Sequence, residues 1–280
     1  MISVAILLLE LVAGFVANSV ALLADAGHVF ADTSGLTLSA AAVWMANRAA
    51  TKTRSYGLYR LEILAAVLNA LLLFGIGVLV IWEGLRRLQE PADVAPALMI
   101  GVAIVALAGN LSALLLLRRG QSASLTLRGA YLEVLSDALG AATVLVAGVI
   151  VALTGFRGAD GLAAIFIGIL ILPRTWRLLR ESLDVLLEAT PKGVDITEVR
   201  RHILDSPGVS AVHDLHAWAI TSGMNVVSAH VVLEPDADPG RLIDHLSDCL
   251  AGDFDIDHST FQLETPEHVL WEGRAARAQH

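Results

Sequence analysis

The chain has 280 residues, of which 55% are apolar and 17% are charged, and its mean hydropathy is +0.66. A soluble domain usually contains about 45–50% apolar residues, so this composition excludes an ordinary water-soluble domain and indicates a membrane protein. The formal net charge of −9 argues against nucleic acid as a partner.

Six apolar segments follow one another through the first two thirds of the chain. A helix needs about 20 apolar residues to cross a hydrocarbon core roughly 30 Å thick. Ile63–Trp82 and Ala95–Leu117 contain no charged residue. The first segment lacks the basic lead and small-residue cleavage site of a signal peptide, and we treat it as a span. We expect transmembrane helices at about residues 2–19, 21–46, 60–85, 95–117, 125–154 and 160–186.

Basic residues gather on one side of this predicted bundle. Ten lie in the connections after spans two and four or at the end of span six, and three lie on the opposite side. Because basic loops are retained in the cytoplasm, we expect both termini there and the protein in a bacterial plasma (inner) membrane. The ten are Arg48, Lys52, Arg54, Arg60, Arg118, Arg119, Arg128, Arg174, Arg177 and Arg180, and the three are Arg86, Arg87 and Arg157.

The sequence changes character at Thr190–Gly193, where a proline and a glycine introduce a polar stretch without any run of membrane-spanning length. We expect residues 1–188 to form a six-helix transmembrane domain and residues 189–280 to form a cytoplasmic domain. The second region has 15 acidic and six basic residues and so carries the whole net charge. This charge suits a domain that attracts cations rather than nucleic acid or anionic lipid.

Hydrophobic periodicity and turn residues divide the polar region into five elements. A helix is followed by two strands joined by a hairpin, a second helix and a last strand. The order α-β-β-α-β predicts a small ferredoxin-like α+β domain after the α-helical membrane bundle. The expected elements lie at residues 196–204, 211–220, 225–233, 239–251 and 260–264, with the hairpin at 221–223.

Ionisable residues inside the predicted spans are candidate metal ligands, since such residues are costly in a membrane. His28 and Asp32 are four residues apart in the second span, and Glu133 and Asp137 repeat this spacing in the fifth. Residues four apart share one helix face. One imidazole and three carboxylates suit tetrahedral Zn²⁺. Asp25, a turn before His28, is a further candidate ligand or a polar group near a helix end.

Ion pairs between helices are the alternative explanation for these carboxylates. No Lys or Arg lies deep in a predicted span to pair with three of them, so we favour a metal site. Metal binding requires deprotonated ligands and releases protons. His28 and the carboxylates can therefore hold either a metal ion or protons.

Motifs along nearly the whole chain resemble the cation diffusion facilitator family. The second span carries a Leu-Leu-Ala-Asp-Ala-Gly-His sequence followed by an aspartate, and the other matches lie at the entry to span three, in span five, at the exit of span six and in the polar region. The matching segments are Leu22–Asp32, Tyr56–Ala66, Tyr131–Gly140, Leu186–Pro191, and His213–Trp218 with the following strand to His230.

The resemblance implies a homodimeric secondary active transporter, not an enzyme, that exports a divalent transition metal in exchange for protons. Zinc is the first expectation and cadmium or cobalt the next, with the metal as substrate and regulatory ligand and no prosthetic group. Spans two and five would form the transport site, and the cytoplasmic domains would bind metal between them. A membrane-bound metal sensor without transport is the alternative.

In the polar region the candidate ligands match family positions or lie on elements that can converge. They are His213, His230, His245 and Glu264, with Asp214, His216 and His258 as weaker candidates.

Two features depart from the family pattern. Glu133 stands where zinc-transporting relatives commonly have His or Asp. A carboxylate oxygen is harder than an imidazole nitrogen, so we expect a broader preference that extends to cobalt or cadmium. The loop Arg118–Arg128 contains no histidine, although some relatives have a histidine-rich tract there, so metal capture is expected to begin elsewhere.

Overall fold

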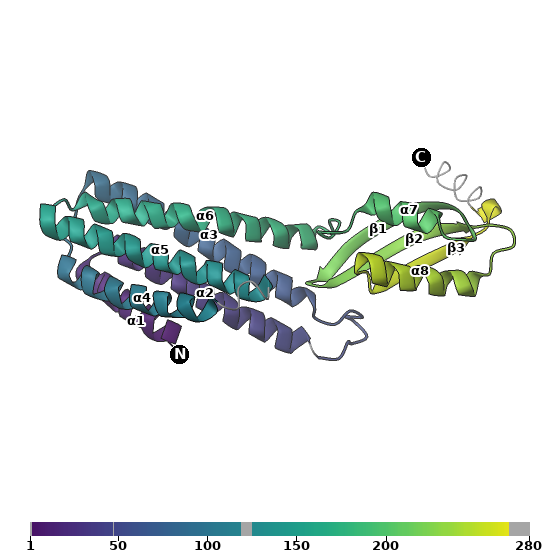
Figure 1. Cartoon of the computed structure of the whole chain (residues 1–280), viewed down its shortest axis with the longest axis horizontal. Coiled ribbons are helices and arrows are strands. Elements are labelled where there is room, and N and C mark those ends of the chain that lie inside the picture. The colour runs from purple at the N-terminus through teal and green to yellow at the C-terminus, as the bar shows by residue number, and fades with distance from the viewer. Residues whose placement is uncertain (1, 47, 119–124, 269–280) are drawn as a thin grey trace. The chain divides into compact units, whose positions relative to one another are not determined.

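The computed structural model describes residues 2–46, 48–118 and 125–268. Arg119 and residues 120–124 of the histidine-free loop lie outside this part. The described N-terminal region is a bundle of long helices, as Figure 1 shows. They are α1 (Ile2–Ala17), α2 (Val20–Ala46), α3 (Arg60–Gln89), α4 (Pro96–Leu117), α5 (Leu125–Thr154) and α6 (Gly158–Leu186).

The helices confirm the predicted six-helix membrane fold. Within the described residues, five helices are long and apolar enough to cross a membrane, and α1 is a shorter apolar helix. A helix satisfies its own backbone hydrogen bonds, which lipid cannot do. Many large apolar side chains, such as Phe15, Leu116 and Leu153, are exposed on the outside of the bundle, as expected for a surface that faces hydrocarbon.

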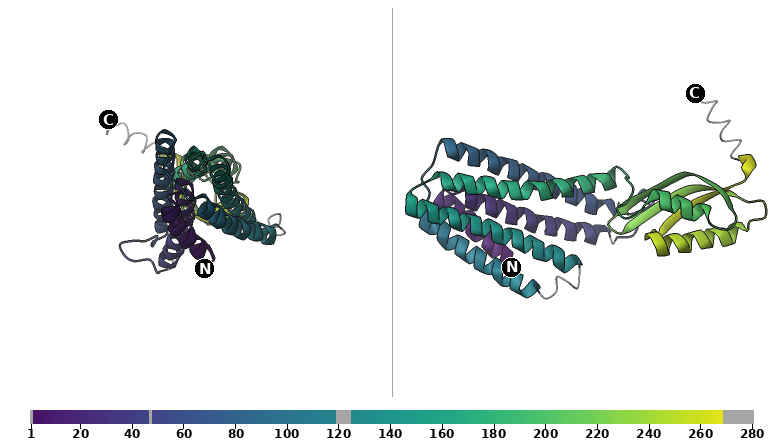
Figure 2. Two further views of the ribbon diagram at one scale, coloured as in Figure 1. Left: turned by 90° about the vertical axis from the view of Figure 1, so that its left-hand side faces the viewer. Right: turned by 45° about the horizontal axis from the view of Figure 1, so that its top comes forward.

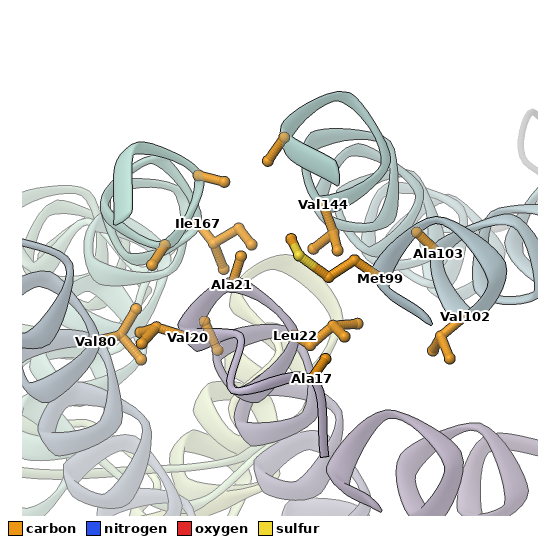
Figure 3. Packing of buried hydrophobic residues seen from close by; sticks show 14 of the residues in the cluster. Ala17, Val20, Ala21, Leu22, Val80, Met99, Val102, Ala103, Val144 and Ile167 are labelled. Carbon is orange, nitrogen blue, oxygen red and sulfur yellow. The ribbon is translucent and has the colours of Figure 1, made fainter. Parts of the chain in front are cut away.

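Small and branched side chains fill the centre of the bundle. Met99 of α4 is fully buried, and its side chain points between Leu22 of α2 and Val144 of α5 (Figure 3). α3 and α6 approach each other at Gly84 and Gly161, where a Cβ on either glycine would come within 2.8 Å of the other residue's carbonyl oxygen. Such small residues allow the close helix packing that membrane bundles use.

A buried carboxylate joins the start of α2 to the start of α6. Asp160 is 1% exposed, and its Oδ1 accepts hydrogen bonds from Ser19 Oγ at 2.5 Å and from Ala21 N at 3.2 Å. Its Oδ2 accepts one from Val20 N at 2.8 Å. The first N–H groups of a helix have no intrahelical partner, so Asp160 acts as a cap supplied from another helix. It orients α2, which carries His28 about two turns later.

The polar region forms the predicted α+β domain. Its elements are α7 (Ile196–Leu204), β1 (Val209–Thr221), β2 (Met224–Leu233), α8 (Pro239–Phe254) and β3 (His258–Glu264). In the described residues the sheet order is β1-β2-β3, with β1 and β2 antiparallel and β2 and β3 parallel (Figure 2). The element order confirms the ferredoxin-like prediction, and the strands begin one or two residues before the expected positions.

Both helices of this domain pack on one face of the sheet. Ile203 of α7 and Leu246 of α8 share a fully buried cluster with Val227, Ala229 and Val231 of β2. Because side chains alternate along a strand, the intervening residues of β2 point to the opposite face of the sheet. This alternation decides which side chains of the domain are available for chemistry.

Candidate metal sites

Three ionisable side chains from α2 and α5 converge inside the helical bundle. His28 Nε2 lies 3.5 Å from Asp32 Oδ2 and 3.2 Å from Asp137 Oδ1. One ligand atom from each of the three residues lies within 4.8 Å of the others. The side chains are 8%, 19% and 21% exposed, so the cluster is largely removed from the surrounding medium. One imidazole and two carboxylates at this separation can surround a single divalent cation.

The hydrogen-bonding state of the cluster suits an incoming ligand. Among the described residues, His28 Nδ1 has no hydrogen-bond partner, and His28 Nε2 contacts Asp137 Oδ1 and Asp32 Oδ2 at ion-pair distance without an aligned hydrogen bond. Buried polar atoms are almost always paired, because an unpaired one keeps its full desolvation cost. A metal ion or a proton bound among these atoms would remove that cost.

A cavity of about 180 Å³ opens beside the cluster. His28 and Asp32 contribute to its wall, together with Asn69 of α3, Glu133 of α5 and Arg174 of α6. Four helices therefore surround one polar space next to the candidate ligands. Such a cavity is where polar side chains and irregular packing are tolerated inside a membrane protein.

Asp25 is buried but lies outside the group of three converging ligands. It is 4% exposed and precedes His28 by one turn of α2. Its Oδ1 would be 2.6 Å from a Cβ on Gly140, so the absence of a side chain at Gly140 lets Asp25 lie directly against α5. The carboxylate is thus held beside the cluster, on the same face of α2.

Glu133 points to a different partner from the other three predicted ligands. Its Oε2 lies 3.2 Å from Arg174 Nη2, and both side chains line the cavity. Glu133 precedes Asp137 by one turn of α5, but only Asp137 reaches His28. Within the described residues, the converging set therefore has three ligands, and Glu133 lies next to it in an ion pair.

A second cluster lies on the open face of the cytoplasmic sheet. His213 of β1 and His230 of β2 are directly opposite in the antiparallel register, with ring centroids 5.0 Å apart. Glu264 ends β3 and pairs in register with the residue two positions after His230, so it lies on the same face. Glu264 Oε2 is 3.0 Å from His213 Nε2, and Oε1 is 2.7 Å from His230 Nδ1.

Glu264 is the centre of this cluster, and its side chain is 1% exposed. Gln262 Nε2 donates a further hydrogen bond to Oε1 at 2.7 Å. Burial raises the pKa of Glu264, but the hydrogen bonds from Gln262 and His213 and the positive charges of His230 and His213 outweigh burial. The pKa therefore lies below its ordinary value, and the carboxylate stays ionised.

Asp214 joins the cytoplasmic cluster through a local irregularity of β1. It adopts a φ of +47°, and the register between β1 and β2 shifts between His213 and His216. This bulge turns the Asp214 carboxylate toward the histidines, so that His213, Asp214 and His230 have ligand atoms within 4.8 Å of one another. Bulges often redirect a side chain at functional positions.

The remaining predicted cytoplasmic ligands lie apart from this cluster. His245 lies on α8, which packs on the other face of the sheet, and its ring nitrogens are 3.6 Å from Cys249 Sγ. His216 is 68% exposed and lies 3.9 Å from Asp214. His258 begins β3 and is exposed. In the described chain none of these three approaches Glu264.

Arg174 and Gln262 contact the candidate ligands but were not predicted. Arg174 belongs to the basic residues at the end of the sixth span, and composition alone does not distinguish an arginine that lines a cavity from one that faces the cytoplasm. Gln262 had a readable signal, because it precedes Glu264 by two residues in a strand and must share its face.

Two models of one protein family match this chain. A family model described as the cation efflux transmembrane domain matches residues 1–187. A second, described as the cytoplasmic domain of cation efflux proteins, matches residues 191–266. The two matches cover almost the whole chain.

Several curated proteins are similar over nearly their full length. The metal cation efflux system protein CzcD of Cupriavidus metallidurans is 44% identical over 259 residues, 92% of this chain and 82% of that protein. The cadmium, cobalt and zinc/H(+)-K(+) antiporter of Bacillus velezensis is 36% identical over 94% of this chain and 85% of its own length. The zinc transporter ZitB of Escherichia coli is 35% identical over 98% and 90%, respectively.

One solved structure is also similar in sequence. The metal-bound C-terminal domain of the CzcD transporter of Cupriavidus metallidurans is 44% identical, and the match covers 25% of this chain and 99% of that domain, with a TM-score of 0.25.

Proposed function

The chain belongs to the cation efflux family, and we propose that it exports zinc, and also cadmium or cobalt, from the cytoplasm in exchange for protons. Membership confirms the family expected from the motifs and a multi-pass membrane transporter rather than an enzyme. The choice of metals is supported by relatives that are named for zinc, or for cadmium, cobalt and zinc together.

One observation carries the transport proposal: His28, Asp32 and Asp137 converge beside a polar cavity within a bundle of membrane-spanning length. An imidazole nitrogen and two carboxylates suit Zn²⁺, which is intermediate between hard and soft metal ions. The same ligands also accept Cd²⁺ and Co²⁺. Glu133 and Asp25 lie within one turn of these ligands and complete the predicted set when the metal is bound. The cavity supplies an access route for a hydrated ion.

Proton exchange follows from the chemistry of the same side chains. A metal ion binds the neutral imidazole of His28 and ionised carboxylates, so metal binding releases protons. In the opposite half of the cycle, protons on His28, Asp32 and Asp137 satisfy the buried atoms that the metal leaves. The ligands thereby carry metal outward and protons inward, and alternating access of the cavity keeps the two fluxes coupled.

The cytoplasmic cluster is the second proposed metal site. His213, His230 and Glu264, with Asp214 beside them, supply nitrogen and oxygen ligands on an open sheet face. His245 lies on another surface of the same domain, so it would join such a site from a second subunit. We infer a homodimer in which metal between the cytoplasmic domains acts as a regulatory ligand.

Membrane placement follows the distribution of basic residues. The ten basic residues after spans two and four and at the end of span six favour a cytoplasmic location for both termini. We therefore propose a plasma (inner) membrane exporter with residues 1–188 as the transport domain and residues 189–280 in the cytoplasm.

The proposal predicts metal-driven proton flux in proteoliposomes containing the purified full-length protein. Zn²⁺, Cd²⁺, Co²⁺ and Mn²⁺ would be tested separately, with a pH-sensitive dye inside the vesicles. Asp137→Ala should reduce zinc-driven flux at least about 100-fold, because it removes a ligand. Glu133→His should narrow the range of transported metals toward zinc by exchanging a hard oxygen for a nitrogen.

Glu90→Gln is the matched control, since Glu90 is an exposed acidic residue at the end of α3 and contacts only Arg86 among the described residues. It should transport as the wild type does. Zinc binding without any proton or metal flux in the wild type would contradict the exporter and leave the membrane-bound sensor.

A further inference from the structure

Arg174 and Glu133 form an ion pair in the wall of the metal-binding cavity. Arg174 projects from α6 and Glu133 from α5, with 3.2 Å between Nη2 and Oε2. Both residues line the same cavity as His28 and Asp32. A guanidinium group stays charged at every physiological pH, so this cavity contains a permanent positive charge.

The pair determines which carboxylates face the metal position. Asp137 Oδ1 lies 3.2 Å from His28 Nε2, whereas Glu133, one turn earlier on α5, is directed to Arg174. Glu133 is consequently absent from the described group of ligand atoms that lie within 4.8 Å of one another. Glu133 and Asp137 are one turn apart on α5, so rotation of the flexible Glu133 side chain away from Arg174 can bring its carboxylate toward Asp137.

The exposure of the pair makes exchange of partners feasible. The side chains of Arg174 and Glu133 are 53% and 37% exposed, in contrast with 8% for His28. An ion pair between partly exposed side chains in the wall of a polar cavity contributes less net stability than a fully buried pair and is more easily broken. A dication that enters the cavity therefore competes for Glu133 with a single charge held by a weak contact.

We propose that Arg174 is a built-in competing cation that holds Glu133 in the metal-free cavity and yields it to the incoming metal. This inference rests on the proposed transport function. By occupying Glu133, the fourth ligand of the predicted set, and repelling the dication, Arg174 lowers the affinity of the site. Weaker binding speeds metal release, and when the metal leaves, Arg174 takes Glu133 back.

The alternative role of Arg174 is structural, as a link between α5 and α6. The two roles differ in what happens when Glu133 is also changed. A competing cation acts on metal affinity through Glu133, so its effect must vanish when the carboxylate is absent. A structural link would alter folding or turnover without a selective change in affinity for metal.

A double-mutant cycle on the full-length protein in proteoliposomes tests the proposal. Zinc-driven proton flux would be measured over a range of Zn²⁺ concentrations for the wild type, Arg174→Gln, Glu133→Gln and the double variant. We expect Arg174→Gln to lower KM about tenfold and to lower kcat, because an adjacent charge commonly changes binding by that factor. In the Glu133→Gln background the same substitution should change KM less than about twofold.

Two further variants control for charge and for helix position. Arg174→Lys keeps the positive charge and should keep KM close to that of the wild type. Arg177→Gln removes a charge from the next turn of α6, and among the described residues Arg177 is exposed and does not line the cavity. It should leave both KM and kcat unchanged.

The outcomes separate this inference from the transport proposal. Wild-type protein without zinc-driven flux would contradict transport itself. Normal wild-type flux with an unchanged or raised KM in Arg174→Gln, or with the same decrease in KM in both backgrounds, would overturn the role of Arg174 alone. If Arg174→Gln shows no flux, the Kd of this variant for Zn²⁺ is measured in detergent instead. Tighter binding than in the wild type supports the role of Arg174, and equal or weaker binding overturns it.

Discussion

The two metal-ligand clusters of this protein use the same residue types in opposite arrangements. In the membrane bundle, one buried imidazole, that of His28, lies 3.2–3.5 Å from the carboxylates of Asp137 and Asp32. In the cytoplasmic domain, Glu264 makes close contacts with His213 and His230 and accepts a hydrogen bond from Gln262.

This difference indicates different costs for the metal-free state. Two carboxylates lie beside a single imidazole in the membrane cluster, so that cluster gains when it takes up either a metal ion or protons. The single carboxylate of the cytoplasmic cluster already contacts two imidazoles and the Gln262 amide, and a metal there must replace existing contacts. We therefore expect the membrane cluster to exchange bound metal for protons in every transport cycle. We expect the cytoplasmic cluster to bind metal according to the metal concentration.

The largest expected effect separates the two clusters by function. Asp32→Asn should abolish metal-driven flux, with a loss of at least about 100-fold, because an amide cannot supply the negative charge that the metal requires. Glu264→Gln should lower flux by only about fivefold, because the cytoplasmic site affects transport indirectly, through the coupling free energy between the two sites. Metal-driven proton flux in proteoliposomes measures both. Equal losses in the two variants would show that the clusters are not functionally distinct.

A smaller effect is expected at the contact between α2 and α5. Gly140→Ala places a Cβ about 2.6 Å from Asp25 Oδ1, so the carboxylate must move. We expect zinc-driven flux to fall about tenfold, because residues that hold metal ligands in position commonly change activity by about that factor when they are altered. Gly75→Ala is the control, because a Cβ there meets nothing within 4 Å. Wild-type flux in Gly140→Ala would exclude Asp25 from the transport mechanism.

The smallest expected effect concerns the acid stability of the cytoplasmic cluster. The folded-state pKa of Glu264 lies below its ordinary value of 4.5, so the ionised form stabilises the folded domain. This stabilisation is fully present above pH 4.5 and is lost as the pH falls through the folded-state pKa. Glu264→Gln should therefore unfold about 5 °C below the wild type at pH 7. The gap should close toward pH 3.

Thermal unfolding of the metal-free full-length protein at pH 7, 5.5, 4.5 and 3 measures this gap, with a chelator present throughout. A difference between wild type and Glu264→Gln that widens toward acid would contradict a lowered pKa at Glu264. Added Zn²⁺ should raise the unfolding temperature of the wild type more than that of the variant at pH 7.

Prediction from sequence was most successful where one local signal decides the outcome. A charge-free run of about 20 residues such as Ile63–Trp82 can cross lipid as a helix that satisfies its own backbone, and the structure has α3 there. The spacing of four residues between His28 and Asp32 places both on one face of α2 whatever surrounds them. Strand alternation likewise ties His230 to one face of the cytoplasmic sheet.

Prediction was limited where two elements distant in sequence must meet. Glu133 and Asp137 share the same spacing as His28 and Asp32, yet Asp137 contacts His28 while Glu133 contacts Arg174. The rotation of α5 and the position of α6 decide this, and neither is encoded in the period of a single helix.

The amino-acid sequence by itself determined the membrane character, the six helices, the α+β domain and the residue types able to bind a metal, because each depends on local hydrophobicity and periodicity. Only the tertiary structure decided which ligands converge. It brings His213, His230 and Glu264 together across three strands, leaves His245 on α8, and supplies Arg174 to the cavity. Side chains from different elements meet only after packing has set the distances between those elements.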